Sequence, residues 1–462
     1  MGEMAVPNDA LYGASTQRAV LNFPISGRPM PEGFIRGLGL VKLACARANE
    51  ELGLLSAEKS SLIQKVSREI VNGQHLDHFP VDVFQTGSGT STNMNINEVI
   101  VTRATQLDGS STAGQRMLHP NDDVNLGQSS NDIIPTALHV SVALALHQKL
   151  LPALTALHAE LQKKSAEFAD VIKIGRTHLM DATPLSVGQE FSGYASQVGK
   201  SLIRIESAIQ VLRELAVGGT AVGTGINCHP EFASRVCSIL NEESGLEFRE
   251  AANHFEAQGA RDDCVDVAGR LATVASSLAK IASDIRLLGS GPRAGIGELF
   301  LPATQPGSSI MPGKVNPVMS EMLIQVCHYV QGLAQTVVAC GRDGQFELNV
   351  TMPLMAHCLH EAVHCLANGA RVFADRCVKD LRADVTRCRE LVDRSLMLVT
   401  ALNPHIGYDQ AASVAKEALA TGRTLREIVL DRKLMDPAVL DQALDPLSMI
   451  RSGASIPGAG GG

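Results

Sequence analysis

Apolar residues recur at spacings of three and four positions along two long stretches of the chain. Residues 184–216 carry them at Val198, Leu202, Ile205, Ile209 and Leu212. Residues 262–289 carry them at Val267, Leu271, Val274, Leu278, Ile281, Ile285 and Leu288. Polar residues fill most of the positions between them. This heptad spacing is typical of long helices packed in a left-handed bundle.

Three further helices are expected beside these two. Residues 132–164 repeat the pattern at Leu150, Leu154, Leu157 and Leu161. Pro152 lies inside that stretch and is expected to bend the helix. Apolar stretches at 318–341 and 352–378 predict the last two helices. Periodicity alone therefore predicts a bundle of long helices.

Two glycine-rich segments, 217–230 and 289–317, interrupt the helical pattern. Loops of that length inside a compact domain are usually functional or disordered. Domain boundaries are expected near 128 and 385. They divide the chain into an N-terminal domain (1–128), a central helical bundle (129–385) and a small C-terminal domain (386–462). The end domains are expected to mix helix and strand, and one strand is expected near 172–174.

Composition narrows the functional class. A chain of 462 residues with 45% hydrophobic and 19% charged residues can bury a substantial core. Only 3% of residues are aromatic, and the net charge is −8. These values argue against nucleic acid or an anionic membrane surface as a partner. No run of about 18 apolar residues occurs, so no membrane span is expected.

Ten cysteines show no Cys-x-x-Cys pair, and most of them lie in apolar helical stretches. A free thiol in such a place behaves as a small hydrophobic group. No signal-like apolar segment is found at the start of the chain. We therefore expect reduced thiols and a cytoplasmic location.

The most informative segment is 307–317, which reads Gly-Ser-Ser-Ile-Met-Pro-Gly-Lys-Val-Asn-Pro. It combines two hydroxyls, one cation (Lys314) and one amide (Asn316) directly before a helix. Such a set suits a reaction in which negative charge builds up beside a carboxylate. A phosphate-binding loop is the rival reading. It is disfavoured because five residues separate the glycines and Val315 replaces the magnesium-binding hydroxyl.

The segment is similar to the signature of the fumarase/aspartase superfamily, and other blocks extend the resemblance in unbroken order from about Val6 to about residue 450. These blocks are 86–90 with 93–98, 119–123, 128–132, 175–184, 218–225, 346–349 and 401–408. Within the superfamily the chain most resembles the class II fumarate hydratases. The resemblance implies a mainly α, three-domain fold with a central bundle of five long helices. It also implies a homotetramer whose active sites are shared between subunits.

The implied reaction is the reversible anti addition of water to fumarate, a small dicarboxylate, which gives (S)-malate through an aci-carboxylate without any cofactor. By resemblance, Ser308 is the base, Lys314 and Asn316 hold the developing charge, and His178 handles the water with Glu321 orienting it. The alternatives are a turn-forming serine at Ser308 and a satisfied surface or core histidine at His178. Aspartases carry glutamine at the position of His178, so histidine favours hydration over ammonia elimination.

Neutral donors are expected to bind the two substrate carboxylates. The candidates are Ser88, Thr90, Ser129, Ser130, Asn131, Thr177 and Ser309. Ser309 has no assigned role in the family and is more typical of a structural residue. Ser130 or Asn131 is also a suitable N-cap for the helix that follows. A second dicarboxylate site known in the family corresponds to Arg116, His119, Asn121 and Asp122. Leu126-Gly127 departs from the basic-plus-small pair that the family carries, which puts the position of that loop in doubt.

One motif indicates different chemistry. The sequence from His360 to His364 fits His-Glu-x-x-His, a pattern by which helices bind catalytic zinc. No third-ligand pattern follows downstream, and the resembled family has no metal at this helix. A zinc metallohydrolase is therefore a distant alternative, adventitious metal binding is a nearer one, and no metal is expected at the active site.

Overall fold

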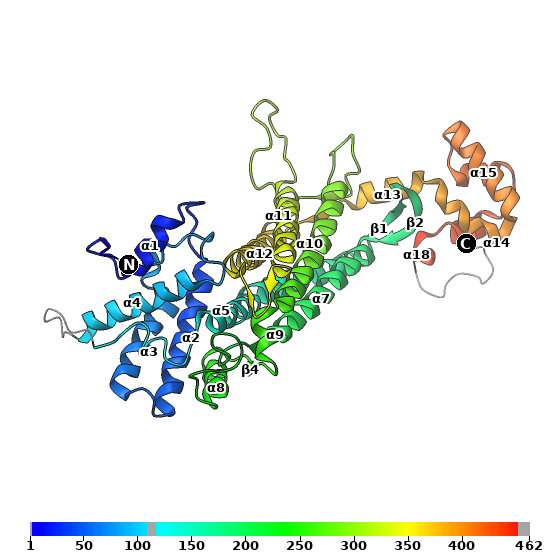
Figure 1. Cartoon of the computed structure of the whole chain (residues 1–462). Helices are drawn as coiled ribbons and strands as arrows, with labels where there is room; N and C mark the ends of the chain where they lie inside the picture. The colour runs from blue at the N-terminus through cyan, green and yellow to red at the C-terminus, as the bar shows by residue number, and fades with distance from the viewer. Residues whose placement is uncertain (1, 109–116, 451–462) are drawn as a thin grey trace. The chain divides into compact units, whose positions relative to one another are not determined.

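The computed structural model describes residues 2–108 and 117–450 (Figure 1). The chain divides into two compact units. The first contains residues 1–154, 201–276 and 325–369, and the second contains residues 155–200, 277–324 and 370–462. The three-domain division at 128 and 385 stays a prediction.

The part of the first unit before residue 128 is helical rather than mixed. It contains α1 (Ala14–Asn22), α2 (Glu32–Glu51), α3 (Ala57–Val71), the 3-10 helix η1 (Leu76–His78) and α4 (Thr90–Asp108). Among the described residues of this part, the one β-type pairing is an isolated bridge between Pro29 and Asp82. Helix α2 is buried on most sides because it packs against α3, α5 and α8.

The five predicted long helices are present within a few residues of their expected bounds. They are α5 (Ser130–Ala145) continuing through η2 (Leu146–Leu150) into α6 (Leu151–Glu167), α7 (Val187–Val211), α10 (Asp262–Leu288), α11 (Val318–Gly341), and α12 (Met352–Phe373) continuing into η3 (Ala374–Val378). Heptad residues such as Val198, Val267 and Leu278 are fully buried. The periodicity therefore identified the faces that pack together.

Pro152 follows a π-helical segment, η2, and the bend expected at this proline stays a prediction. Proline lacks an amide hydrogen and its ring crowds the carbonyl four residues earlier, so the preceding turn widens. The continuous stretch Ser130–Glu167 is the one helix among the described residues that is long and apolar enough to cross a membrane. Its most apolar window is 56% buried inside the protein, and the core helix of a soluble protein passes the same test.

Short elements complete the first unit. Two two-residue strands, β3 (Glu214–Leu215) and β4 (Arg249–Glu250), form a parallel pair. Helix α8 (Phe232–Ser244) lies between them in the chain, and helix α9 (His254–Gly259) follows β4.

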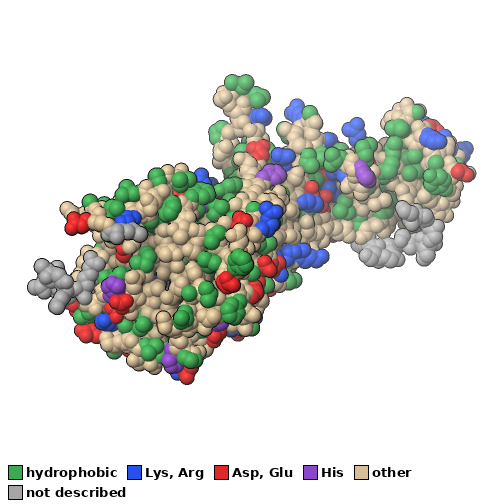
Figure 2. Space-filling view, in the orientation of Figure 1, with side chains coloured by type: hydrophobic (Ala, Val, Ile, Leu, Met, Phe, Trp, Pro, Cys, Tyr) green, Lys and Arg blue, Asp and Glu red, His purple; other side chains and the backbone are tan. Residues whose placement is uncertain are grey.

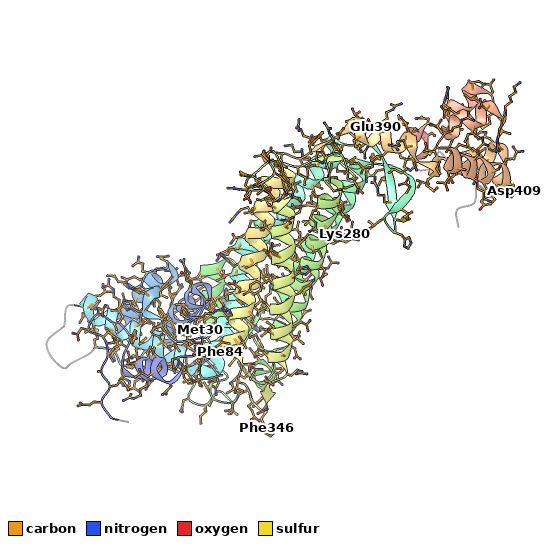
Figure 3. The ribbon with its side chains drawn as sticks, turned by 90° about the horizontal axis from the view of Figure 1, so that it is seen from above. Met30, Phe84, Lys280, Phe346, Glu390 and Asp409 are labelled. Atoms are coloured by element: carbon orange, nitrogen blue, oxygen red, sulfur yellow. The ribbon has the colours of Figure 1, made fainter. Side chains whose placement is uncertain are left out.

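The loop 301–317 stands out from the helix ends beside α11, and hydrophobic side chains gather on it (Figures 1 and 2). Ile310 is 83% exposed, and Met311 and Val315 are each 47% exposed. A second projecting apolar side chain is Phe346, labelled in Figure 3, at the turn between β6 (Gly344–Gln345) and β7 (Leu348–Asn349). Phe346 is 94% exposed.

The second unit contains the predicted strand near 172–174. Strand β1 (Ile172–Thr177) pairs antiparallel with β2 (Met180–Ser186), and the register shifts between Ile174 and Arg176. Two shorter strands, β5 (Leu299–Phe300) and β8 (Arg382–Ala383), also pair antiparallel.

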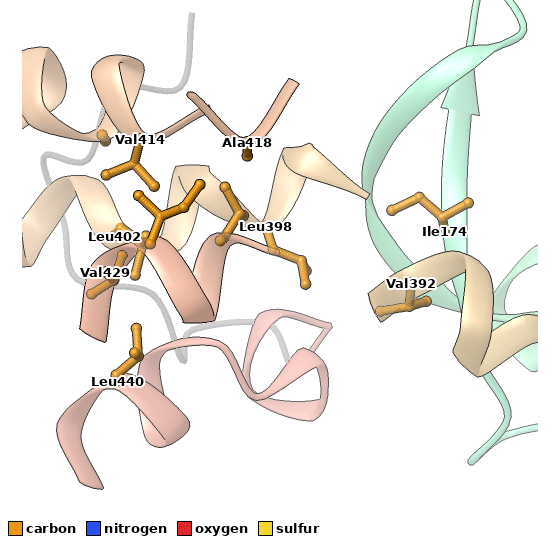
Figure 4. Close-up of a cluster of buried hydrophobic side chains, with 11 residues drawn as sticks. Ile174, Val392, Leu398, Leu402, Val414, Ala418, Val429 and Leu440 are labelled. Atoms are coloured by element: carbon orange, nitrogen blue, oxygen red, sulfur yellow. The ribbon is translucent and has the colours of Figure 1, made fainter. Parts of the chain in front are cut away.

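Helices form the C-terminal end of the second unit, where a mixed domain was expected. They are α13 (Val385–Arg394), η4 (Leu396–Leu402), α14 (Asn403–Ile406), α15 (Tyr408–Thr421), α16 (Leu425–Asp431), α17 (Pro437–Ala443) and α18 (Pro446–Met449). Their apolar core includes Leu402, Val414 and Leu440, and Ile174 from β1 joins it beside Val392 (Figure 4). This packing fixes one face of the β1–β2 hairpin.

Candidate active site

The loop around Ser308 is closed at its base by backbone contacts. The Gly307 amide donates to the Lys314 carbonyl at 2.8 Å, and the Asn316 side-chain amide donates to the Gly307 carbonyl at 2.7 Å. A Cβ on Gly307 would lie 2.5 Å from the Lys314 carbonyl oxygen, so only glycine fits this closure. Asn316, expected to hold charge, therefore has a second role as a clasp.

The Ser308 hydroxyl oxygen accepts hydrogen bonds from two backbone amides. They are those of Ile310 at 3.2 Å and Met311 at 3.1 Å. Two N–H dipoles directed at one oxygen would stabilise negative charge on it. The same contacts are also those of a turn-forming serine, so the geometry fits both readings. Ser309 is exposed, and no hydrogen bond of its side chain is found among the described residues.

Two other predicted site residues, Lys314 and Glu321, lie near the end of this loop and in the helix that follows it. Lys314 is exposed near the end of the loop, and Glu321 is half-buried in the first turn of α11. The side chain of Lys314 thus remains open to a substrate anion, while its carbonyl closes the loop.

His178 lies at the tip of the β1–β2 hairpin, in a two-residue turn with Leu179. Their φ angles are +56° and +60°, so both residues adopt the left-handed conformation of a type I′ turn. Thr177 is the last residue of β1, and both Thr177 and His178 are exposed. This exposure leaves the imidazole available to a ligand or a partner.

Three of the predicted carboxylate-binding residues of the first unit form a chain of hydroxyls. The Ser88 and Thr90 hydroxyls lie 2.8 Å apart, and those of Thr90 and Ser130 lie 2.7 Å apart. Ser129 is the N-cap of α5, and with Asp132 it completes a capping box. The expectation that Ser130 or Asn131 caps the helix is therefore wrong, because α5 already begins at Ser130.

Asp132 ties this loop to the glycine-rich segment 217–230. Its fully buried carboxylate accepts from the amides of Ser129 at 2.9 Å, Gly218 at 3.0 Å and Thr220 at 3.1 Å. The Asn131 side chain donates to the Ala221 carbonyl at 2.9 Å. Burial raises the pKa of Asp132 to about 6, although the three amides act in the opposite direction.

Lys42, which no motif indicated, supports the same loop from α2. Its ammonium donates to the side-chain oxygens of Asn125 and Gln128, each at 2.9 Å. Burial lowers the pKa of Lys42 to about 8. A single lysine inside the apolar stretch of α2 was the available signal, because a lysine is almost never fully buried without partners.

The unusual residue Leu126 contributes its carbonyl rather than its side chain to this support. The Asn49 amide donates to that carbonyl at 3.0 Å, and the Gln128 amide donates to it at 3.3 Å. The loop is thus held through contacts that do not depend on a basic side chain at position 126.

The second predicted dicarboxylate site is only partly described. The Asp122 amide donates to His119 Nδ1 at 3.2 Å, and the Asp122 carboxylate lies 3.0 Å from the same nitrogen. His119, Asn121 and Asp122 are all exposed. Arg116 lies outside the described residues.

The zinc-like motif on α12 does not present two free imidazoles. His360 is buried, and its Nε2 lies 2.9 Å from the Ser141 hydroxyl, whereas His364 is exposed and its Nε2 lies 3.1 Å from the Asn368 amide. Burial lowers the pKa of His360 to about 3. Within residues 2–108 and 117–450, no group of three or more histidine, cysteine or acidic side chains could hold a metal ion.

A cavity of about 350 Å³ in the first unit contains none of the predicted site residues. Its cationic walls are largely neutralised by their own neighbours. Arg68 is paired with Glu243 at 2.7 Å, and Arg36 lies 4.0 Å from Glu32. This cavity is therefore not the candidate active site.

The structure thus groups the predicted residues in two sets. The first unit holds Ser88, Thr90, Ser129, Ser130 and Asn131, and the second unit holds Thr177, His178, Ser308, Ser309, Lys314, Asn316 and Glu321. Within the first set, hydrogen bonds join Ser88, Thr90 and Ser130 in one chain. Within the second set, a hydrogen bond joins Asn316 to the base of the Ser308 loop.

Comparisons with known proteins identify the family of this chain. A family model described as Lyase matches residues 2–332, and one described as Fumarase C C-terminus matches residues 398–451. The class II fumarate hydratase of Mycobacterium tuberculosis (strain ATCC 25618 / H37Rv) is 51% identical over 457 residues, which cover 98% of this chain and 95% of that protein. The class II fumarate hydratase of Halobacterium salinarum is 51% identical over 453 residues, which cover 98% and 96%.

A solved structure extends the likeness to three dimensions. The recombinant class II fumarase from Schistosoma mansoni superposes with a TM-score of 0.94 at 42% identity, and the match covers 97% of each chain. The predicted mainly helical fold and the resemblance stated above are therefore confirmed. Because about half of its residues are identical to those of these relatives over nearly the full length, this chain belongs to the class II fumarate hydratase family of lyases.

Proposed function

We propose that this chain catalyses the reversible, stereospecific hydration of fumarate to (S)-malate by anti addition of water. The single observation that carries the proposal is the Ser308 hydroxyl, which accepts two backbone N–H groups in a loop closed at Lys314. Serine is a weak base unless its alkoxide is stabilised, and this geometry supports such stabilisation. Family membership supports the choice of substrate.

In the dehydration direction, the Ser308 alkoxide removes the proton from the malate carbon next to one carboxylate. The electron pair moves onto that carboxylate, which becomes an aci-carboxylate held by Lys314 and Asn316. The C–O bond then breaks, and the hydroxyl leaves as water with a proton from His178. Glu321 orients that imidazole. Hydration is the reverse sequence, and every step uses side chains of the protein, so no cofactor is required.

Ser88, Thr90, Ser129, Ser130, Asn131, Thr177 and Ser309 are proposed to bind the substrate carboxylates. The N-terminus of α5 supports this role, because its amides and dipole favour an anion. His119, Asn121, Asp122 and Arg116 are proposed as a second dicarboxylate site.

A homotetramer with active sites shared between subunits is part of the proposal. The exposed side chains of Ile310, Met311 and Val315 support it, because several apolar groups gathered on one projecting loop commonly mark a protein interface. The proposed location is the cytoplasm, which agrees with ten free cysteines.

An ammonia-lyase of the aspartase type is the second candidate, and substrate choice separates the two. Purified protein should release fumarate, measured by its ultraviolet absorbance, from malate but not from aspartate. His178→Gln introduces the residue that aspartases carry at this position, and it should abolish release from malate. Release from aspartate, with none from malate, would overturn the proposed function.

A further inference from the structure

The turn that carries His178 is conformationally unfavourable for its own sequence. Type I′ turns favour Asn-Gly or Gly-Gly because both central residues have positive φ. Here the two residues are His178 and Leu179, which both carry a Cβ, at φ +56° and +60°. Such a conformation persists only where the surrounding structure holds it. The structure must therefore contain a group that fixes the turn.

Glu298 is bonded to the strand that leads into this turn. Its carboxylate is fully buried and binds both terminal nitrogens of Arg176, at 3.0 Å and 2.9 Å. Arg176 comes two residues before His178. Lys173, on the same strand, lies 3.2 Å from the Glu298 carboxylate and 3.0 Å from Glu190. The register shift between Ile174 and Arg176 re-aims the strand, so both cations reach one carboxylate.

Glu298 is itself fixed at its backbone. Its amide donates to the Leu288 carbonyl at the end of α10, and its carbonyl accepts from the Asp384 amide, each at 2.9 Å. The apolar contact of Ile174 with the C-terminal core holds the hairpin near its base but supplies no direction to its tip. A bidentate Arg–carboxylate pair does supply direction, because both groups are planar.

We propose that Glu298 is a positioning residue for the reaction, which holds the strained turn of His178 in place through Arg176. This inference rests on the proposed function, since it assigns His178 to the reaction. Arg176 and Glu298 touch no reacting atom in this assignment. Their effect on turnover passes through the orientation of the imidazole.

Glu298→Gln tests the inference, with Glu190→Gln as its matched control. Both changes remove one carboxylate from Lys173, but only the first removes the partner of Arg176. Glu298→Gln should lower kcat for malate at least tenfold and change KM less than threefold. Glu190→Gln should keep kcat within twofold of the wild type. Equal losses in the two variants, or wild-type kcat in Glu298→Gln, would overturn the inference.

A rescue experiment separates positioning from general destabilisation. Leu179→Gly places glycine where the turn prefers it, so the turn no longer needs an external hold. Leu179 is 76% exposed, and its removal leaves no cavity. In the Glu298→Gln background, Leu179→Gly should recover most of the lost kcat, and in the wild type it should change kcat less than twofold. Absence of rescue in a folded double variant contradicts the inference.

Two further measurements keep the test decisive. If Glu298→Gln does not fold, Arg176→Lys keeps the charge but loses the planar fork, and it should lower kcat at least threefold. Amide hydrogen exchange of residues 172–186 should be faster in Glu298→Gln than in Glu190→Gln, and equal rates would refute the hold on the turn. A wild-type protein inactive on malate refutes the proposed function instead, while the exchange comparison still tests Glu298.

Discussion

Replacing Ser308 with asparagine separates the two roles that fit its hydroxyl. As a base, the hydroxyl must lose its proton, and an amide cannot do that. As a turn former, it only accepts the amides of Ile310 and Met311. The asparagine side-chain oxygen accepts such amides equally well in an Asx-turn. Ser308→Asn therefore keeps the turn and removes the base.

The magnitudes explain why alanine alone is insufficient. A general acid or base contributes about 10²–10⁴ in rate, or about 3–5 kcal/mol. Two neutral hydrogen bonds contribute about 1 kcal/mol each, so losing both costs about 2 kcal/mol, or a factor of about 30. Ser308→Ala removes both the base and the two hydrogen bonds. The smallest loss in kcat expected from removing a base is close to the loss expected from the turn alone, so the alanine variant does not separate the two roles. Ser308→Asn should still lose about 10²–10⁴ in kcat with little change in KM.

The assay is steady-state release of fumarate from malate, with Thr304→Ala as the matched control. Thr304 is an exposed hydroxyl residue of the same loop that has no proposed role in binding, and it should be replaceable with less than a threefold change in kcat. Lys314→Ala should impair both kcat and KM, because its charge meets the substrate anion and the transition state. A Ser308→Asn enzyme with near-normal turnover would refute the base assignment and favour the turn-forming role.

Three other outcomes are expected. The inactive variants Ser308→Ala and His178→Asn should complement when they are unfolded together and refolded, with about a quarter of the sites in mixed tetramers recovering both groups; mixed tetramers of verified mass without activity would place both residues in one chain's site. Exhaustive chelation should leave activity unchanged, and His364→Ala should retain wild-type kcat; activity lost on chelation and restored by zinc would revive the metallohydrolase reading. Burial lowers the pKa of His139 and His360 to about 3 from an ordinary 6.5, so stability is fully present above pH 6.5 and falls with acidification, by about 2 kcal/mol per histidine at pH 5. Urea unfolding at pH 7 and pH 5 measures this loss, and His360→Asn should show a shallower dependence than the wild type; identical slopes would contradict the assignment.

Sequence reasoning succeeded where one short pattern determines the outcome. The heptads around Val198 and Val267 located two helices because each buried face is encoded locally. The prediction that the two end domains mix helix and strand was wrong. No periodic pattern of apolar residues supported that prediction. The roles of Glu298 and Lys42 could not be predicted for a different reason. Their partners lie far away in sequence, and only the folded chain brings them together. The site residues came from family motifs, and their roles stay predictions.

The closure of the 307–316 loop has a kinetic consequence. The Gly307 amide is bonded to the Lys314 carbonyl, and the Asn316 side chain is bonded to the Gly307 carbonyl, so the segment is a loop closed at its base. Because Ser308 and Lys314 both belong to this loop, any movement of the loop as a whole moves the two residues together. If the two residues have the proposed roles, we expect opening and closing of this loop to affect both through one equilibrium rather than through two independent movements.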